Sequence, residues 1–273
     1  MSDYNAADNS AKSYALAVDT MREKLESFHR VQIGDCTLYN ADCREVLPLL
    51  PKVDAVVTDP PYGIAYVTSF RYVSDAPAML HGDDFAPLET VKPMVAALKS
   101  GGAIYLCTRL DVAEQWRVAL ADAGAENKTA IVWDKTNHTA GDLDGDYGAQ
   151  TELILFAHKG RHLLRGGRDV NLWRVPRPIF GDHPTPKPVD LMGRAIRNST
   201  DPAGLVLDAF MGSGTTGVAC VKLGRKFIGI EIEPKYFEIA CRRIQAAYDQ
   251  PDMFIEAAKP KAEQLDMLAE AAE

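Results

Sequence analysis

The stretch LVLDAFMGSGTTG, residues 205–217, runs from an apolar strand through a glycine-rich turn into a helix. Glycines allow the chain to turn tightly and its backbone to approach a ligand closely. Gly212, Gly214 and Gly217 match the pattern G-x-G-x-x-G, and Glu231 lies near the end of the next strand, where it is placed to accept hydrogen bonds from ribose hydroxyls. A plain strand-to-helix turn would also satisfy the glycine pattern alone.

Apolar strands alternate with amphipathic helices along most of the chain. Strand patterns cover residues 53–59, 103–108, 129–135, 151–159, 205–210 and 226–232, with helical patterns between most of them. This alternation predicts an α/β fold with a mainly parallel sheet and helices on both faces. Ligands of such sheets bind at the carboxyl ends of the strands.

A second strand end, VVTDPPYG at residues 56–63, carries unusual residues. Two prolines remove two backbone donors and fix φ, so neither strand nor helix continues through Pro60 and Pro61. Asp59 and Tyr62 therefore flank a rigid turn at the tip of a buried strand, where a carboxylate and an aromatic ring are available to a ligand.

Three ligands compete for the glycine turn. A nucleoside triphosphate site would need a lysine after the last glycine, but Val218 and Ala219 stand there, so this site is rejected. A nicotinamide dinucleotide fits the glycines, although the chain beyond them is short for the usual six-stranded dinucleotide fold. S-adenosylmethionine is favoured by Asp208, which could hold a cationic amino group directly or through water.

Together the two strand ends suit methylation of an exocyclic amine such as adenine N6 or cytosine N4. Asp59 would accept one N–H and the carbonyl of Pro60 another, directing the nitrogen lone pair at the methyl group. These dipoles would also stabilise the positive charge that develops on nitrogen. Tyr62 would stack on the base, which offsets part of the cost of extruding it from the duplex.

With these motifs the sequence resembles the amino-group DNA methyltransferases of the β arrangement over most of residues 31–247. That family carries D-P-P-Y first, then a target-recognition region, then F-x-G-x-G. The matching residues here are Asp59-Pro60-Pro61-Tyr62 and Phe210-Met211-Gly212-Ser213-Gly214. The resemblance implies the Rossmann-like, S-adenosylmethionine-dependent methyltransferase fold, with a mainly parallel, seven-stranded sheet and the motifs in permuted order.

Further motifs extend the resemblance to the cofactor site. HPTPKP at 183–188 resembles the family's H-P-T-x-K-P element, which implies that His183, Thr185 and Lys187 approach the methionine carboxylate. NADCREVLPLLP at 40–51 resembles a segment that places Asp42 near the adenine, with Ala41 in place of the family's glycine. The implied cofactor set also contains Asp208, Phe210, Gly212, Ser213, Gly214, Thr215 and Glu231.

The aspartate of D-P-P-Y usually accompanies adenine in this family, so the resemblance implies site-specific N6-adenine methylation after base flipping. N4-cytosine methylation is the alternative. More remote alternatives are an NAD-dependent oxidoreductase built on the same glycines and a non-catalytic DNA-binding protein that retains the fold.

Charge is unevenly distributed along the chain. The net charge of −8 argues mildly against nucleic acid, but residues 158–198 are locally basic. The candidate DNA contacts are Arg161, Arg165, Arg168, Arg174 and Arg177. Trp116 and Trp133 lie on helix and strand patterns and are predicted to be core, whereas Trp173 is as consistent with base stacking as with the core.

These patterns divide the chain into five segments. They are an N-terminal helical arm (1–30), a catalytic half (31–158), a target-recognition lobe (159–184, with loops 64–88 and 136–148 as candidate additions), a cofactor-binding half (185–248) and an acidic tail (249–273). Double-stranded DNA is the expected partner, and the resemblance also allows a homodimer and a cognate restriction enzyme.

The remaining composition indicates a cytoplasmic protein. Five cysteines form no C-x-x-C pair, and the six histidines form no metal-binding pattern, so no metal is expected. No apolar run reaches the length of a membrane span, and the first residues lack the basic-then-apolar layout of a signal peptide.

Overall fold

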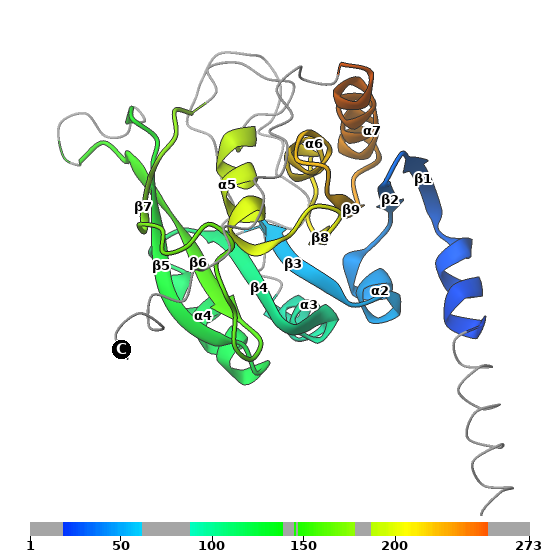
Figure 1. Ribbon diagram of the computed structural model, residues 1–273, viewed down its shortest axis with the longest axis horizontal. Coiled ribbons are helices and arrows are strands. Elements are labelled where there is room, and N and C mark those ends of the chain that lie inside the picture. The colour runs from blue at the N-terminus through cyan, green and yellow to red at the C-terminus, as the bar shows by residue number, and fades with distance from the viewer. Residues whose placement is uncertain (1–18, 62–87, 139–144, 146, 178–186, 251–273) are drawn as a thin grey trace, which may run out of the picture.

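A computed structural model describes residues 19–61, 88–138, 145, 147–177 and 187–250. Residues 19–27 are helical, and the described chain then forms one sheet with the strand order β1-β2-β9-β8-β3-β4-β6-β5-β7 (Figure 1). The strands are β1 (His29–Ile33), β2 (Cys36–Asn40), β3 (Val53–Thr58), β4 (Leu98–Thr108), β5 (Glu126–Asp134), β6 (Thr151–His158), β7 (Leu172–Arg174), β8 (Leu205–Asp208) and β9 (Lys226–Glu231).

The centre of the sheet is parallel, as predicted. Neighbouring strands β2, β9, β8, β3 and β4 all run in one direction, whereas β6 is antiparallel to both β4 and β5. The described residues form nine strands rather than the expected seven. The difference arises because β1 pairs antiparallel with β2 at one edge and the three-residue strand β7 pairs with β5 at the other.

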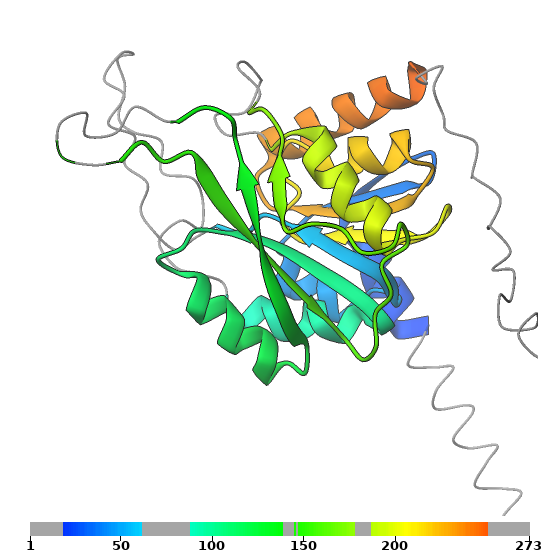
Figure 2. The same cartoon turned by 60° about the vertical axis from the view of Figure 1, so that its left-hand side comes forward.

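Helices cover both faces of the sheet, as predicted (Figures 1 and 2). One face carries α5 (Val189–Ser199), α6 (Thr215–Lys222) and α7 (Pro234–Asp249), and the other carries α2 (Cys43–Val46), α3 (Val91–Ala97) and α4 (Ala113–Asp122). Short 3-10 helices, η1 (Leu47–Leu49) and η2 (Leu88–Thr90), lie beside the second group.

The alternation of side chains along β3 explains the two cores. Val57 packs in the cluster that contains Leu191 of α5 and Ile244 of α7, whereas its neighbour Val56 packs in the cluster that contains Met94 of α3. Successive residues of a strand point to opposite faces, so a continuous apolar run is what a strand buried on both faces requires.

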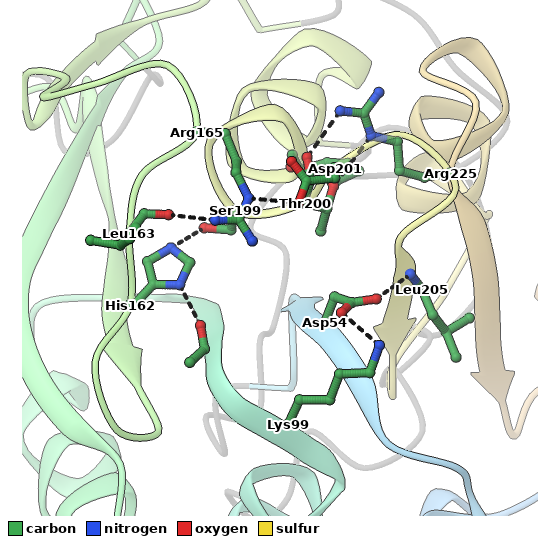
Figure 3. Close-up of polar contacts among 12 residues, drawn as sticks. Asp54, Lys99, His162, Leu163, Arg165, Ser199, Thr200, Asp201, Leu205 and Arg225 are labelled. Atoms are coloured by element: carbon green, nitrogen blue, oxygen red, sulfur yellow. Dashed lines mark hydrogen bonds and ion pairs between the residues drawn. The ribbon is translucent and has the colours of Figure 1, made fainter. Parts of the chain in front are cut away.

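The amino ends of the strands are tied together by a set of polar contacts (Figure 3). Asp54 accepts a hydrogen bond from Lys99 Nζ at 2.7 Å and another from the backbone N–H of Leu205 at 2.8 Å. His162 contacts the carbonyl oxygen of Gly101 at 2.7 Å and Ser199 Oγ at 2.9 Å. These contacts join β3, β4, β8 and the end of α5 along the amino ends of the strands, which we call the amino edge; the opposite ends form the carboxyl edge.

Three residues of the segment expected as an irregular lobe belong to the sheet. Within its described part, residues 159–177, Leu172–Arg174 forms β7, and Trp173 is 1% exposed with its Nε1 donating to Val170 O at 2.9 Å. Trp173 is therefore a core residue, as are Trp116 and Trp133. Residues 178–184 lie outside the described chain.

No helix in the described ranges has both the length and the apolar character needed to cross a membrane. Those ranges also contain no grouping of three or more His, Cys, Asp or Glu side chains with metal-binding geometry.

Candidate active site

The two strand ends singled out in the sequence lie side by side. β3 and β8 are parallel neighbours, with Val56 opposite Leu207. At their carboxyl ends Thr58 Oγ1 donates a hydrogen bond to Asp208 Oδ1 at 2.7 Å, and both side chains are buried. Asp59, the next residue after β3, is thereby fixed beside the glycine turn that follows β8.

Asp208 organises this junction. Its carboxylate also accepts hydrogen bonds from Thr216 Oγ1 at 2.6 Å and from the backbone N–H of Phe210 at 3.1 Å. Burial raises the pKa of Asp208 to about 6, against the opposing effect of these hydrogen bonds. The carboxylate therefore joins β3, the turn and α6, and its predicted contact with a cationic amino group stays a prediction.

The glycine turn leaves room for a ligand at one position. Gly212 and Gly214 have φ values of 53° and 82°, in the region that favours glycine. A Cβ on Gly214 would lie 2.9 Å from the Cβ of Ala240 on α7, whereas a Cβ on Gly212 would meet no atom of the described residues within 4 Å. Gly214 is needed for helix packing, and the space beside Gly212 fits the close approach of a cofactor.

Side chains from α7 and β9 hold this turn in place. Arg243 Nη1 donates to the carbonyl oxygen and to Oγ of Ser213, each at 2.7 Å, and lies 3.4 Å from Thr215 Oγ1. The backbone N–H of Gly212 donates to Glu231 Oε2 at 2.8 Å. Ser213 and Thr215 thus contact the protein itself at the turn where the sequence predicted cofactor contacts.

Glu231 and Asp42 lie on adjoining strand ends, since the backbone N–H of Ala41 donates to Glu231 O at 3.1 Å. Burial raises the pKa of Glu231, whose second oxygen accepts the N–H of Glu233. Asp42 caps α2, and its side-chain hydrogen bond with Arg44 lowers its pKa. The two residues predicted to contact ribose and adenine thus lie on neighbouring strand ends, and each carboxylate already accepts hydrogen bonds from the protein.

Asp59 is paired in this structure with a lysine from the start of α5. Lys187 Nζ lies 2.9 Å from Asp59 Oδ2 and 3.1 Å from Glu152 Oε2. Pro60 is buried and Pro61 half-buried, which agrees with a rigid turn. Tyr62, His183 and Thr185 lie outside the described residues.

The five candidate arginines do not share one edge of the sheet. Arg174 ends β7 and pairs with Asp134 at the carboxyl end of β5, and the N–H of Arg177 donates to Lys135 O, so both lie at the edge that carries Asp59.

The other three arginines lie away from that edge. Arg165 pairs with Asp201, before the start of β8, and Arg161 follows the end of β6, so both lie at the opposite edge. Arg168 is exposed beside Asp169, which pairs with Arg194 in α5.

Several residues of the site carried no motif in the sequence. Glu152, Lys135, Thr58, Thr216 and Arg243 all contact predicted site residues or one another. The available signal was weak: Glu152 and Lys135 are charged residues at the ends of otherwise apolar strand patterns. Only the pairing of distant segments brings Glu152 and Lys135 to the site, whereas Thr58 and Thr216 lie within the two quoted stretches.

A parallel sheet with a glycine turn at one strand end and an acid-proline turn at the next defines the class of Rossmann-like methyltransferases. Known proteins agree with this assignment. A family model described as "DNA methylase", of the N6/N4 methyltransferases, matches residues 165–242.

The solved structure named M1.HpyAVI–SAM complex is 30% identical, with a TM-score of 0.63, and the match covers 76% of this chain and 99% of that one. Type II methyltransferase M2.DpnII of Streptococcus pneumoniae is 34% identical over 55% of this chain and 62% of that protein. This chain thus spans about three fifths of the length of that curated relative. Type II methyltransferase M2.MboI of Moraxella bovis is 28% identical over 76% of this chain and 86% of that protein. The chain belongs to the N6/N4 amino-methyltransferase family.

Proposed function

We propose that the protein is an S-adenosylmethionine-dependent, site-specific DNA methyltransferase that acts on the N6 amino group of an adenine extruded from the duplex. The observation that carries the proposal is the junction of β3 and β8. The hydrogen bond from Thr58 to Asp208 fixes the Asp59 turn beside the glycine turn, so an acceptor for the amine adjoins a site suited to a methyl donor.

The cofactor would lie along the carboxyl ends of β8, β9 and β2. Space beside Gly212 admits it, and Glu231 and Asp42 offer carboxylates for its ribose and adenine. Asp208, whose carboxylate lies at the base of the turn, supplies negative charge near the methionine end. S-adenosylmethionine contributes an electrophilic methyl group, and the protein supplies position and charge.

Asp59 would accept one N–H of the target amine, and the carbonyl of Pro60 would accept the other. These contacts favour a tetrahedral nitrogen and stabilise the positive charge that develops there. Because Lys187 pairs with Asp59 in this structure, the lysine has to share or release that carboxylate when the amine arrives. Tyr62 would stack on the extruded base.

DNA would bind across the carboxyl edge of the sheet. Arg174 and Arg177 lie at that edge and are the better placed of the five arginines for phosphate contacts, which usually outnumber base contacts. The segment 159–184 would contribute to target recognition. A cytoplasmic location, a dimer and a partner restriction enzyme fit the Type II relatives and are part of this proposal.

N4-cytosine methylation is the second candidate. The Asp59 carboxylate and the Pro60 carbonyl together form a clamp that would hold either amine. Analysis of modified nucleosides separates the two. The protein is expressed in a host without DNA methylases, and the digested DNA is examined by mass spectrometry for N6-methyladenine and N4-methylcytosine. N6-methyladenine supports the proposal, and N4-methylcytosine alone would overturn the choice of base.

The clamp is tested with Asp59→Ala, which should lower the methylation rate at least about a hundredfold, since loss of one preorganised electrostatic contact typically costs that much. Asp122→Ala, at an exposed position at the end of α4, is the matched control and should retain full activity. Full activity of a folded Asp59→Ala protein would contradict the clamp mechanism.

A further inference from the structure

Four charged side chains alternate in sign across the carboxyl ends of the strands. In order they are Asp59, Lys187, Glu152 and Lys135. Lys187 Nζ lies 2.9 Å from Asp59 and 3.1 Å from Glu152, and Lys135 Nζ lies 3.4 Å from the other oxygen of Glu152. The side chain of Lys187 is 10% exposed and that of Glu152 is 25% exposed, so the row is largely shielded from water.

The direction of β6 explains why Glu152 is present at this edge. β6 runs antiparallel to β4 and β5, so its first residues, rather than its last, lie at the carboxyl ends of its neighbours. Glu152 sits opposite Trp133 on β5, and Lys187 Nζ lies 5.8 Å from the centre of the Trp133 ring. The lysine is therefore held between two carboxylates and against an aromatic face.

Glu152 is ionised in this setting. Burial alone would raise its pKa, but the ammonium groups of Lys187 and Lys135 hold that pKa below the usual value. Lys135 is 4% exposed, and a buried charge is tolerated when it is paired. Glu152 thus carries a full negative charge between two cations.

This row of charges affects how strongly Lys187 holds Asp59, the carboxylate of the proposed clamp. Asp59 can accept a hydrogen bond from the target amine only to the extent that its carboxylate is not held by Lys187. Because Glu152 also contacts the Lys187 ammonium, the attraction of that ammonium is divided between the carboxylates of Asp59 and Glu152. Removing that second carboxylate would strengthen the attraction between the Lys187 ammonium and Asp59.

We propose that Glu152 is a positioning residue for methyl transfer, which holds the Lys187 ammonium so that Asp59 remains available to the target amine. The inference rests on the proposed clamp function of Asp59. Glu152 acts through Lys187 and does not touch the reacting atoms. Lys135 in turn holds the carboxylate of Glu152 from its far side.

The test compares Glu152→Gln with the wild-type protein in single-turnover methylation of duplex DNA and in calorimetric binding of S-adenosylmethionine. The rate constant should fall about tenfold, while the cofactor Kd changes by less than about threefold, because the loss is confined to the reaction step. Glu126→Gln is the matched control: it removes a carboxylate from the other end of the same strand pair, where Glu126 pairs with Lys128. It should match the wild type in both measurements.

A double-mutant cycle with Lys187→Met shows whether Glu152 acts through the lysine. If it does, adding Glu152→Gln to Lys187→Met should change the rate constant by less than about twofold, because the two residues are coupled. A full tenfold further loss would overturn the inference.

A purely structural role of Glu152 makes a different prediction. Lys135→Met combined with Glu152→Gln removes one charge of each sign, so the buried row keeps its net charge. If the only role of Glu152 is to neutralise the charge of Lys135, this double variant regains the wild-type rate, and the inference is wrong. If Glu152 positions Lys187, the double variant stays about tenfold slow even with a wild-type melting temperature. The same variant decides the matter if Glu152→Gln alone does not fold.

The outcomes also separate this inference from the proposed function. Equal rates for wild type and Glu152→Gln, with Asp59→Ala inactive, would overturn the role of Glu152 and leave the clamp intact. A folded wild-type protein that methylates no base would refute the proposed function, and this inference with it.

Discussion

At the amino ends of the strands Asp54 and His162 join neighbouring elements (Figure 3), whereas the carboxyl ends of the same sheet gather Asp59, Asp208, Glu152 and Lys187. At the amino edge the contacts run largely to backbone groups and to hydroxyls. At the carboxyl ends Asp59, Lys187 and Glu152 are partly buried and paired with one another, and the buried Asp208 is held by hydroxyls and a backbone N–H. The first arrangement stabilises the fold, and the second retains charge where burial makes it costly.

Figure 3 shows the His162 ring between Ser199 and the chain at the start of β4. Ser199 Oγ contacts His162 Nε2 and lies 2.8 Å from Tyr105 OH, and the other ring nitrogen contacts the carbonyl oxygen of Gly101. A carbonyl oxygen only accepts, so the proton is assigned to Nδ1 of a neutral ring. The same sheet thus carries contacts that join its elements at the amino ends of the parallel strands and the candidate site at their carboxyl ends.

Asp208→Asn should give the largest effect among changes that sharpen this comparison. The substitution preserves shape and removes a buried charge, so we expect cofactor affinity to fall about tenfold while the protein remains folded. Calorimetric titration with S-adenosylmethionine measures the affinity. Unchanged affinity would show that Asp208, like Asp54, only stabilises the fold.

The raised pKa of Asp208 also makes the stability of the wild type depend on pH, and Asp208→Asn should remove that dependence. The folded pKa of Asp208, about 6, lies above its ordinary value of 3.8. Its contribution to the unfolding free energy is therefore fully present below pH 3.8 and is lost as pH rises through 6, by at most about 3 kcal/mol. Denaturant unfolding at several pH values should show this loss in the wild type and not in Asp208→Asn.

His162→Ala tests the opposite edge. Loss of its two hydrogen bonds should lower the unfolding free energy by about 2 kcal/mol, without changing the methylation rate of the folded protein at saturating cofactor. A reduced rate under those conditions would show that the two edges are not independent.

His162 also predicts a dependence on pH. Burial lowers its pKa from 6.5, so its stabilising contribution is present above pH 6.5 and is lost as pH falls through the lower folded value. Thermal melts of wild type and His162→Ala should converge as the solution is acidified below pH 6.5. A gap that stays constant would contradict the neutral, hydrogen-bonded ring.

The smallest effects are expected for surface arginines at the two edges. Arg174→Gln should weaken DNA binding several-fold and reduce its salt slope by about 1, because a phosphate contact is lost. Arg165→Gln, which breaks a pair with Asp201 at the opposite edge, should leave DNA affinity unchanged. Binding isotherms at two salt concentrations measure both, and equal losses would place DNA across both edges.

Local patterns in the sequence were sufficient to predict most of the elements and the motifs. The glycine turn, the acid-proline turn and Glu231 could be recognised because each depends on a few adjacent residues with distinctive backbone chemistry. β7 could not, because three residues of strand inside an irregular segment have no measurable period and form only by pairing with β5. Trp173 showed the same limit: only the observed packing decided between core and base stacking.

The sequence by itself determined that this chain is an α/β protein with its candidate site residues at two strand ends, because strand periodicity, glycine turns and prolines act locally. Tertiary structure alone decided which side chains share the site. The antiparallel insertion of β6 delivers Glu152 to the carboxyl edge, and the start of α5 delivers Lys187 to Asp59. Strand direction and pairing depend on contacts between segments far apart in the chain, so no local pattern encodes that row of charges.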